Sequence, residues 1–362
     1  MIDFISLILY LFIAFISTAF FSACKSKNQW MRYIGISLSI LIPSIFAGIR
    51  YNVGTDYQNY WWTFEQLDHV SFEWILTDSS HFNMDRGFLI VSKIFRLGFN
   101  SKCVFAIWGA IILTIFVLTI YNQYREYDIT LMYLTFVLMY YYSSFNILRQ
   151  ILALVIVFYS LKYVRSNQLI KYLILVLIAT TFHFSALLVL PIWFLWDHKL
   201  NKSINLVKKW MICLAAIIAV GMWQSILKLL ANFNISVILK YTGYFEKNNH
   251  MNMSFLIKVV LTLFFIILQT RFQNKDDKLV FLTSLFILGT IIEYTGYYSS
   301  FVKRCSIYYA VSEIVLFSEV PLFFTKYSKQ LCRFLVVLFI VLYFALSSFV
   351  LKQGELIPFR IF

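Results

Sequence analysis

The chain has 362 residues, of which 61% are hydrophobic and only 13% charged, and its mean hydropathy is +0.77. Soluble domains are about 45–50% apolar and about 25% charged, and a chain of this length has too little interior to bury the excess. The composition therefore excludes a soluble globular protein. Glycine and proline are sparse, at 11 and 4 residues, which favours packed helices over a barrel. The sequence predicts an all-α polytopic membrane protein.

The net charge of +14 does not indicate nucleic acid as a partner, because Lys and Arg are scattered in short stretches between apolar segments. The five cysteines have neither CxxC nor metal-ligand spacing, so we expect no disulfide and no metal site. The first apolar stretch, 2–23, is too long for the core of a signal peptide and is interpreted as a retained first span. The partner that the composition predicts is membrane lipid.

A membrane-crossing helix needs about 20 apolar residues. The apolar segments predict about 11–13 transmembrane helices in a single transmembrane domain, 1–362, and their ranges are 2–23, 33–49, 102–121, 129–145, 147–164, 169–182, 184–196, 210–231, 255–271, 279–295, 303–324 and 332–350. Segments 169–182 and 184–196 are too short to be ordinary crossings. They predict a broken hairpin that turns near His183, and a single helix over 169–196 is the alternative.

Two loops are expected on the periplasmic side, because the hairpin keeps the loops rich in Lys and Arg on the cytoplasmic side. The first, 50–101, is too long for a plain connector. Within it, 87–99 alternates apolar positions with basic residues at helical spacing, which predicts an amphipathic helix in the outer interface; a transmembrane segment is the alternative. The second, 232–254, is rich in Asn and Tyr, which suit sugar hydroxyls and rings, although Tyr is also common at membrane interfaces.

Ionisable residues near or within membrane segments are by default candidates for function. A first cluster follows the second span, with Arg50, Gly54, Asp56 and Tyr60. Gly54 allows a sharp turn, so that Arg50 and Asp56 can face one pocket at the outer surface. An Arg50–Asp56 ion pair that only clamps the loop is the alternative.

A second cluster lies at the outer start of a later span, where Asn146, Arg149 and Gln150 share one helical face. That face is expected to point away from lipid, although an arginine that snorkels to the headgroups is the alternative. His183 lies in the turn of the predicted hairpin. Irregular backbone at membrane depth is tolerated only where protein buries it or a cavity wets it, so His183 is a functional candidate, with a hydrogen-bonded core histidine as the alternative.

Another cluster, with Lys303, Arg304 and Tyr308, lies at an outward turn. Arg50, Arg149 and Arg304 thus all fall at the outer ends of spans, and they are predicted to converge on one anion. The guanidinium fork suits phosphate oxygens, so the predicted ligand is phosphate or pyrophosphate. No P-loop, GxGxxG, HExxH or GxSxG pattern is present, and a substrate that carries its own activation, such as a lipid-linked pyrophosphate sugar, fits best.

Four short motifs carry a resemblance to a known family: RYNVGTDYQNY from residue 50, NILRQILA from 146, FHFSALLVLP from 182 and KRCSIYYAV from 303. In their order and spacing, over about 30–325, they resemble the EpsG family of bacterial polysaccharide polymerases, related in role to the Wzy O-antigen and capsule polymerases. The matching positions are Arg50, Gly54, Asp56, Tyr60, Arg149, Gln150, His183, Ser185 and Arg304. The insert 61–85 departs from the family pattern.

The resemblance implies a GT-C-like, multi-pass enzyme of the bacterial inner membrane. Such an enzyme joins undecaprenyl-pyrophosphate-linked oligosaccharide repeat units at the periplasmic face, without metal, nucleotide or other cofactor, and a chain-length regulator is a further expected partner. His183 is the leading candidate for the base and Asp56 the second. The residues expected to bind the pyrophosphate and stabilise its charge are Arg50, Tyr60, Arg149, Gln150, Lys303, Arg304 and Tyr308. A flippase or transporter of the same lipid-linked sugar, and an O-antigen ligase, are the alternative functions.

Overall fold

The computed structural model describes residues 2–77, 80–198, 202–203, 253–271, 276–295 and 304–361. This part of the chain is mostly helical, and its only strands are the antiparallel pair β1 (Trp196–Asp197) and β2 (Lys202–Ser203). Among the described residues, five helical stretches are long and apolar enough to cross a membrane: Ile2–Lys25, Gln29–Ile49, Ser101–Gln123, Ser144–Arg165 and Lys326–Val350. The predicted all-α polytopic fold is confirmed. The expected span 210–231 and the expected loop 232–254 lie outside the described residues, apart from the last two residues of that loop.

The chain divides into two compact units. The first comprises Met1–Tyr159, Leu177–Phe184 and Phe317–Phe362, and the second Ser160–Val176 and Ser185–Leu316. The α-helices are α1 (Ile2–Ser22), α2 (Gln29–Ile49), α3 (Tyr57–Gln66), α4 (Phe72–Thr77), α5 (Arg86–Arg96), α6 (Ser101–Gln123), α7 (Ile129–Phe136), α8 (Ser144–Arg165), α9 (Leu169–Phe182), α12 (Met253–Arg271), α13 (Asp277–Thr295), α15 (Ile307–Ala310), α16 (Glu313–Glu319) and α17 (Lys326–Ala345). Shorter turns include the 3-10 helices η1 (Ala23–Lys25), η2 (Leu67–His69), η3 (Ser80–Phe82), η5 (Phe184–Leu195), η8 (Val320–Phe323) and η10 (Gln353–Glu355), and the π-helices η4 (Val137–Tyr141) and η9 (Leu346–Val350).

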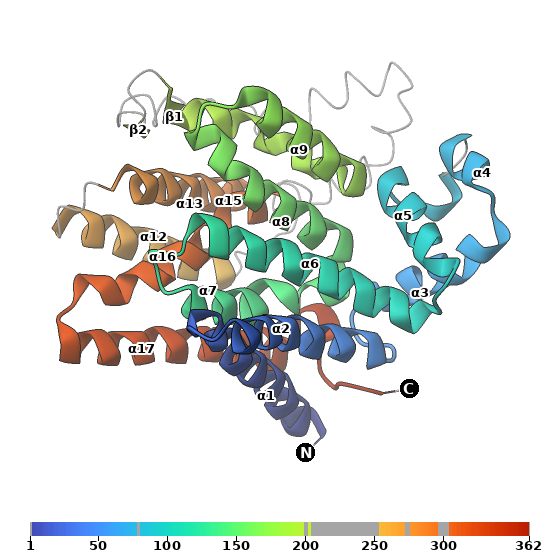
Figure 1. Ribbon diagram of the computed structural model, residues 1–362, viewed down its shortest axis with the longest axis horizontal. Helices are drawn as coiled ribbons and strands as arrows, with labels where there is room; N and C mark the ends of the chain where they lie inside the picture. The colour runs from blue at the N-terminus through green and yellow to red at the C-terminus, as the bar shows by residue number, and fades with distance from the viewer. Residues whose placement is uncertain are drawn as a thin grey trace. The chain divides into compact units, whose positions relative to one another are not determined.

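In the first unit, α2 packs against both α1 and α6 (Figure 1). Gly48 lets the backbones of α2 and α6 come close together, since a Cβ added at Gly48 would lie only 2.9 Å from the Cβ of Ala106. Within a membrane, helices gain little from apolar burial against one another, and close backbone approach at such residues supplies the packing contacts instead. The three loop helices α3, α4 and α5 gather beyond one end of α6 (Figure 1).

A proline inside α2 explains one polar contact in this apolar interior. Pro43 has no N–H, so the carbonyl of Ser39, four residues earlier, loses its helical donor. The buried hydroxyl of Tyr133 donates to that carbonyl instead. The hydroxyl of Tyr141 donates to the carbonyl of Pro43 itself, at 2.9 Å. Such replacements are what allow a proline in a helix at membrane depth.

At the end of the first unit away from α3–α5, Asp128 joins three segments that the sequence places in cytoplasmic loops. Asp128 caps the start of α7 by accepting from the backbone of Thr130 and Leu131. Its carboxylate also pairs with Lys25, 3.5 Å away, and with Arg333, 2.9 Å away. Lys25 and Asp128 precede α2 and α7, and Arg333 lies within α17, so one carboxylate joins three helices at this end of the unit.

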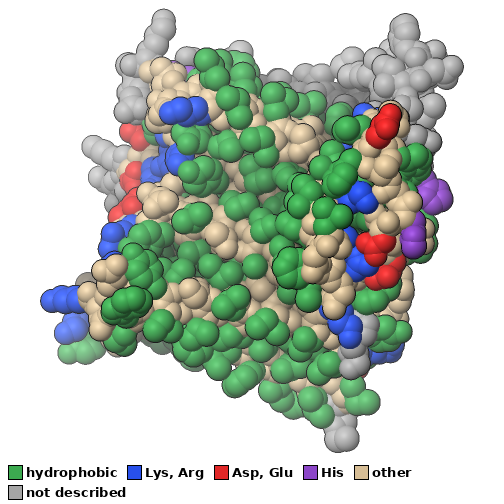
Figure 2. All heavy atoms as spheres, turned by 45° about the vertical axis from the view of Figure 1, so that its right-hand side comes forward, with side chains coloured by type: hydrophobic (Ala, Val, Ile, Leu, Met, Phe, Trp, Pro, Cys, Tyr) green, Lys and Arg blue, Asp and Glu red, His purple; other side chains and the backbone are tan. Residues whose placement is uncertain are grey.

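The surface fits a lipid environment. Large apolar side chains are exposed along α1, α2, α9, α12 and α17, with Ile170 at 74% and Val260 at 64% of their full accessibility. Apolar side chains likewise cover most of the face seen in Figure 2, whereas charged side chains lie toward its left and right edges and histidines gather where α3–α5 come forward. The charged loop region and the apolar spans are therefore separate parts of the surface.

The predicted broken hairpin is confirmed. The helix α9 ends at Phe182, and a long 3-10 helix, η5, begins at Phe184. The hydroxyl of Tyr172 on the first arm donates to the carbonyl of Val189 on the second, at 2.6 Å. A contact between residues so close in sequence requires the chain to fold back, which excludes a single helix over 169–196.

The loop helix expected at 87–99 is also present, as α5. It has 11 residues and buries one side through Phe88, Leu89, Ser92 and Lys93. A helix of this length is too short to cross a membrane, so the transmembrane alternative does not apply.

The predicted single span 303–324 is wrong in detail. Its described part is broken into α15 and α16, which end at Ala310 and Glu319. At the first break, the hydroxyl of Ser312 donates to the carbonyl of Tyr309 at 3.0 Å and so competes with the backbone ladder. Pro321 accounts for the second, since a proline disfavours helical geometry in the residue before it.

The second unit contains α12 and α13, which pair through polar side chains. Lys258 forms an ion pair with Glu293, and the hydroxyls of Thr262 and Thr290 lie 3.0 Å apart. Gln269 donates to Thr283 further along the same seam. Side-chain hydrogen bonds of this kind hold helices together where the surroundings are apolar.

Candidate active site

The chain turns sharply where α2 ends and the long loop begins, as the glycine there predicts. Gly54 has a φ of +102°, and a Cβ on it would lie 2.6 Å from the carbonyl oxygen of Phe145. Its own carbonyl accepts from the N–H of Tyr57, which starts α3. Only glycine combines this left-handed backbone with such close approach. The turn therefore lays the loop directly against the start of α8.

That contact joins two of the motifs found in the sequence. The side-chain oxygen of Asn146 accepts from the N–H of Thr55 at 2.6 Å and from its hydroxyl at 3.1 Å. The C-terminal segment completes the arrangement, because the N–H of Gly54 donates to the carbonyl of Glu355 at 3.2 Å. Three stretches that are remote in sequence are thus held together at the loop end of the spans.

The centre of the site is a carboxylate shared by an arginine and a histidine. One oxygen of Asp85, Oδ2, lies 2.7 Å from Nη1 of Arg149 and 3.6 Å from Nδ1 of His183. Each of the three side chains retains 16–18% of its accessibility. They are mostly buried, but part of each side chain stays accessible. We call Asp85, Arg149 and His183 the Asp85 cluster.

The local backbone explains how each member reaches the cluster. Asp85 is the N-cap residue of α5, but its side chain makes no capping hydrogen bond and is directed to Arg149 instead. Arg149 follows a distortion at Ile147 (φ −102°, ψ 50°) within α8. His183 follows the last residue of α9, and its N–H donates to the carbonyl of Ala179. Two helix ends and a kink therefore aim the three side chains at one another.

Tyr60, on α3, lies against the same arginine. Its side chain is 2% exposed, and its hydroxyl is hydrogen-bonded to Arg149. Burial raises the pKa of Tyr60, while the positive charge of Arg149 acts in the opposite direction and the negative charge of Asp56 adds to the increase. The predicted residues Tyr60, Arg149 and His183 are thus brought together, with Asp56 close enough to act on the Tyr60 hydroxyl.

Arg50 is placed differently, inside a cage of aromatic rings. Its guanidinium carbon lies 4.0 Å from the ring centre of Phe145, 4.6 Å from that of Phe105 and 5.7 Å from that of Tyr57. The residue is 1% exposed, and its Nε and Nη1 find no hydrogen-bond partner among the described residues. Burial lowers the pKa of Arg50 to about 10, so it stays protonated at neutral pH. Attraction between a cation and the ring faces partly compensates the lost water.

The remaining predicted residues are not part of this cluster. Gln150 is 2% exposed on α8. Arg304 is exposed and belongs to the second unit, and Lys303 lies outside the described residues. Tyr308 is fully buried in the second unit, with its hydroxyl 3.1 Å from the Ser185 hydroxyl.

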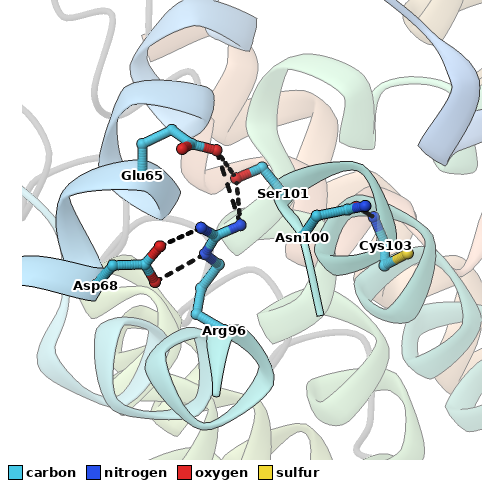
Figure 3. Close-up of polar contacts among 6 residues, drawn as sticks. All are labelled: Glu65, Asp68, Arg96, Asn100, Ser101 and Cys103. Carbon is cyan, nitrogen blue, oxygen red and sulfur yellow. Dashed lines mark hydrogen bonds and ion pairs between the residues drawn. The ribbon is translucent and has the colours of Figure 1, made fainter. Parts of the chain in front are cut away.

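A second polar cluster holds the loop that carries Asp85 (Figure 3). Arg96, near the end of α5, pairs with both carboxylate oxygens of Asp68 and donates to the hydroxyl of Ser101 at 2.9 Å. Ser101 in turn donates to Glu65, on α3. Ion pairing with Arg96 lowers the pKa of Asp68. The cluster ties α3, η2 and α5 to the start of α6, and so fixes the helix whose other end bears Asp85.

Sequence reasoning did not identify Asp85 as a site residue, although Asp85 ends the insert 61–85 that was singled out. An aspartate directly before an amphipathic helix has an obvious local role as an N-cap, and nothing in its sequence neighbours indicates the histidine 98 positions later. The role of the C-terminal segment was missed for the same reason, because its contact with Gly54 depends on how the chain returns. Among the described residues, no group of three or more His, Cys, Asp and Glu side chains is arranged to hold a metal ion.

The fold and the cluster together define a polytopic helical membrane protein in which an arginine, a histidine and an aspartate gather beside the long loop. The model of the EpsG family matches residues 33–361. The chain therefore belongs to the EpsG family, the family of Wzy-type polysaccharide polymerases. The match extends past the four motifs to residue 361 and includes the C-terminal segment that contacts Gly54. No curated protein and no solved structure matches the chain.

Proposed function

We propose that this protein is a polysaccharide polymerase of the bacterial inner membrane that joins undecaprenyl-pyrophosphate-linked oligosaccharide repeat units at the periplasmic face. It works without nucleotide or metal, because the lipid diphosphate already activates the sugar. The observation that carries the proposal is the Asp85 cluster, in which Arg149 and His183, from two of the family motifs, meet on one partly accessible carboxylate.

The reaction is a glycosyl transfer between two lipid-linked glycans. A hydroxyl of the incoming unit loses its proton to His183 and attacks the anomeric carbon of the growing glycan. The bond from that carbon to the diphosphate oxygen breaks, and its electron pair leaves with undecaprenyl pyrophosphate. The proton then passes from His183 to water. The products are the longer glycan on its new carrier and one free lipid diphosphate.

Arg149 stabilises the charge that grows on the leaving diphosphate. A donor placed in advance in a recess of this kind is typically worth roughly 3–4 kcal/mol of barrier, and the guanidinium fork matches two phosphate oxygens at once. In the proposal, Arg50 adds positive charge and Gln150 helps to shape the binding site. Asp56 is the second candidate for the base.

Polymerisation is tested with purified protein and synthetic lipid-pyrophosphate repeat units, in the presence of a chelator and with no nucleotide. The expected result is a ladder of longer glycans, which Arg149→Ala abolishes and His183→Gln slows to a low but measurable rate while the protein remains folded. Arg333→Ala serves as the matched control, because Arg333 pairs with Asp128 at the other end of the spans. The control is expected to make a normal ladder.

The alternative functions give different results in the same preparation. A flippase would move the lipid-linked unit across liposomes and leave it chemically unchanged. A ligase would transfer a finished glycan to a different acceptor but would form no ladder from repeat units alone. Either result, or a ladder that Arg149→Ala leaves intact, would overturn the proposal.

A further inference from the structure

A single oxygen of Asp85 faces both of the groups that the proposed reaction needs. Oδ2 is within hydrogen-bonding distance of Arg149 (2.7 Å) but slightly too far from the Nδ1 of His183 (3.6 Å) for a strong hydrogen bond. The carboxylate therefore lies closer to the arginine than to the histidine. The ionisable groups around it come from four elements: Asp85 itself before α5, Arg149 on α8, His183 after α9 and Tyr60 on α3, with Asp56 next to that helix.

We propose that Asp85 is a positioning residue that changes partner when the substrate binds: it holds Arg149 in the empty site and holds His183 once a diphosphate occupies Arg149. The inference rests on the proposed function. A diphosphate carries more charge than a carboxylate and offers several oxygens to the guanidinium fork. It therefore competes for Arg149, and the displaced carboxylate remains beside the imidazole.

The exchange prepares the base at the moment when it is needed. When Asp85 accepts a hydrogen bond from Nδ1–H of His183, the other ring nitrogen, Nε2, carries the lone pair that takes the proton of the attacking hydroxyl. The carboxylate also stabilises the imidazolium that results. A contact that is long in the empty site and shortens in the substrate complex is common for catalytic hydrogen bonds.

The substitution Asp85→Asn separates this role from a structural one. Asn is as good an N-cap as Asp, and the Asp85 side chain makes no capping hydrogen bond, so α5 is expected to remain folded. Removing the charge frees Arg149 for anions but leaves the imidazole without its carboxylate. We expect kcat to fall about 10- to 100-fold, the loss typical when a group that orients a metal-bound histidine is removed. The inhibition constant of inorganic pyrophosphate should fall up to about fivefold, the scale of a partly exposed ion pair.

The matched control is Asp128→Asn, which makes the same change at an N-cap residue with two ion pairs at the other end of the spans. It should alter neither kcat nor inhibition by pyrophosphate. A double substitution tests whether Asp85 acts through His183. In protein that already carries His183→Gln, Asp85→Asn should lower kcat no further. Additive losses would mean that Asp85 does not act through His183.

The inference is overturned if Asp85→Asn leaves kcat unchanged, or if it weakens inhibition by pyrophosphate, as loss of a purely structural contact would. If Asp85→Asn does not fold, Asp85→Glu takes its place: it keeps the charge but displaces the oxygen, and an unchanged kcat there would equally overturn the inference. A wild-type protein that forms no ladder would refute the proposed function instead. Binding of inorganic pyrophosphate, measured directly by calorimetry and tightened by Asp85→Asn, would still support the competition for Arg149.

Discussion

Asn146 and Thr55 are 91 residues apart in the chain, yet one side-chain oxygen of Asn146 accepts two hydrogen bonds from Thr55, from its N–H at 2.6 Å and from its hydroxyl at 3.1 Å. This oxygen connects the loop that follows α2 to the start of α8, three residues before Arg149. The position of Arg149 relative to Tyr60 therefore depends on a contact that neither residue makes itself.

Replacing Asn146 by Ala is expected to destabilise the loop end of the first unit. The change removes both hydrogen bonds, and because Thr55 is exposed and can turn to water, each is expected to be worth about 0.5–1.5 kcal/mol. Thr55→Val removes only the longer of the two hydrogen bonds and should cost about 0.5–1.5 kcal/mol. Thermal unfolding in detergent measures both, and Asn146→Ala should also lower polymerisation. A larger loss for Thr55→Val than for Asn146→Ala would contradict this account.

The C-terminal segment should be essential to the site, and one glycine tests this. Gly354 has a φ of +72°, and a Cβ on it would lie 2.1 Å from the side-chain nitrogen of Asn146. The left-handed backbone alone costs an alanine roughly 1–2 kcal/mol, and Asn146 must also move. We expect Gly354→Ala to lower both the melting temperature and the activity.

Gly98 offers a control for that substitution, because a Cβ added there meets no atom within 4 Å. Gly98→Ala, at the end of α5, should leave both properties close to wild type. If the two variants behave alike, the C-terminal segment does not support the site in the way described.

The ion pair between Asp68 and Arg96 predicts a dependence of stability on pH. Because Arg96 lowers the pKa of Asp68 in the folded protein, the pair stabilises the fold above the unfolded pKa of aspartate, about 3.9. This contribution is lost as the pH falls through the lower, folded pKa. The raised pKa of Arg96 has no effect in this range, since arginine stays charged.

The measurement compares the melting temperatures of wild type and Asp68→Asn at pH 7 and at pH 3. The variant should melt lower at pH 7, and the difference should narrow at pH 3. Asp68 is 40% exposed, so solvent screening keeps the effect small. Glu73→Gln, on exposed α4, provides the control and should shift the melting temperature less. If the difference in melting temperature between wild type and Asp68→Asn is larger at pH 3 than at pH 7, the predicted direction of the pH dependence is wrong.

The proposed orientation predicts which residues are accessible from outside the cell membrane. A cysteine at Glu73, on the loop expected in the periplasm, should react with a membrane-impermeant maleimide in cells whose outer layers admit the reagent. A cysteine at Lys27, in the first loop expected in the cytoplasm, should react only after the membrane is opened. Both positions are exposed, so burial does not explain a difference, and wild-type protein reports the background from the native cysteines. The reverse labelling pattern would invert the topology.

Features that depend on a continuous run of residues were predictable from the sequence alone. The apolar segments predicted the membrane class, and the two short segments on either side of His183 predicted the hairpin. The periodicity of 87–99 predicted α5, and Gly54 predicted a turn. Each of these follows from the local competition between apolar side chains, water and lipid, or from the steric freedom of one residue, and needs no knowledge of distant parts of the chain.

What only the tertiary structure decided is which remote side chains meet. Arg50 was predicted to face a phosphate, but the rings of Phe105 and Phe145 enclose it, and its burial depends on residues 55 and 95 positions away. Asp85 has the sequence pattern of an ordinary N-cap. Its contacts with Arg149 and His183 depend on how the start of α5, the start of α8 and the end of α9 are packed together. Long-range contacts of this kind arise from the packing of the whole unit, and no local pattern in the sequence encodes them.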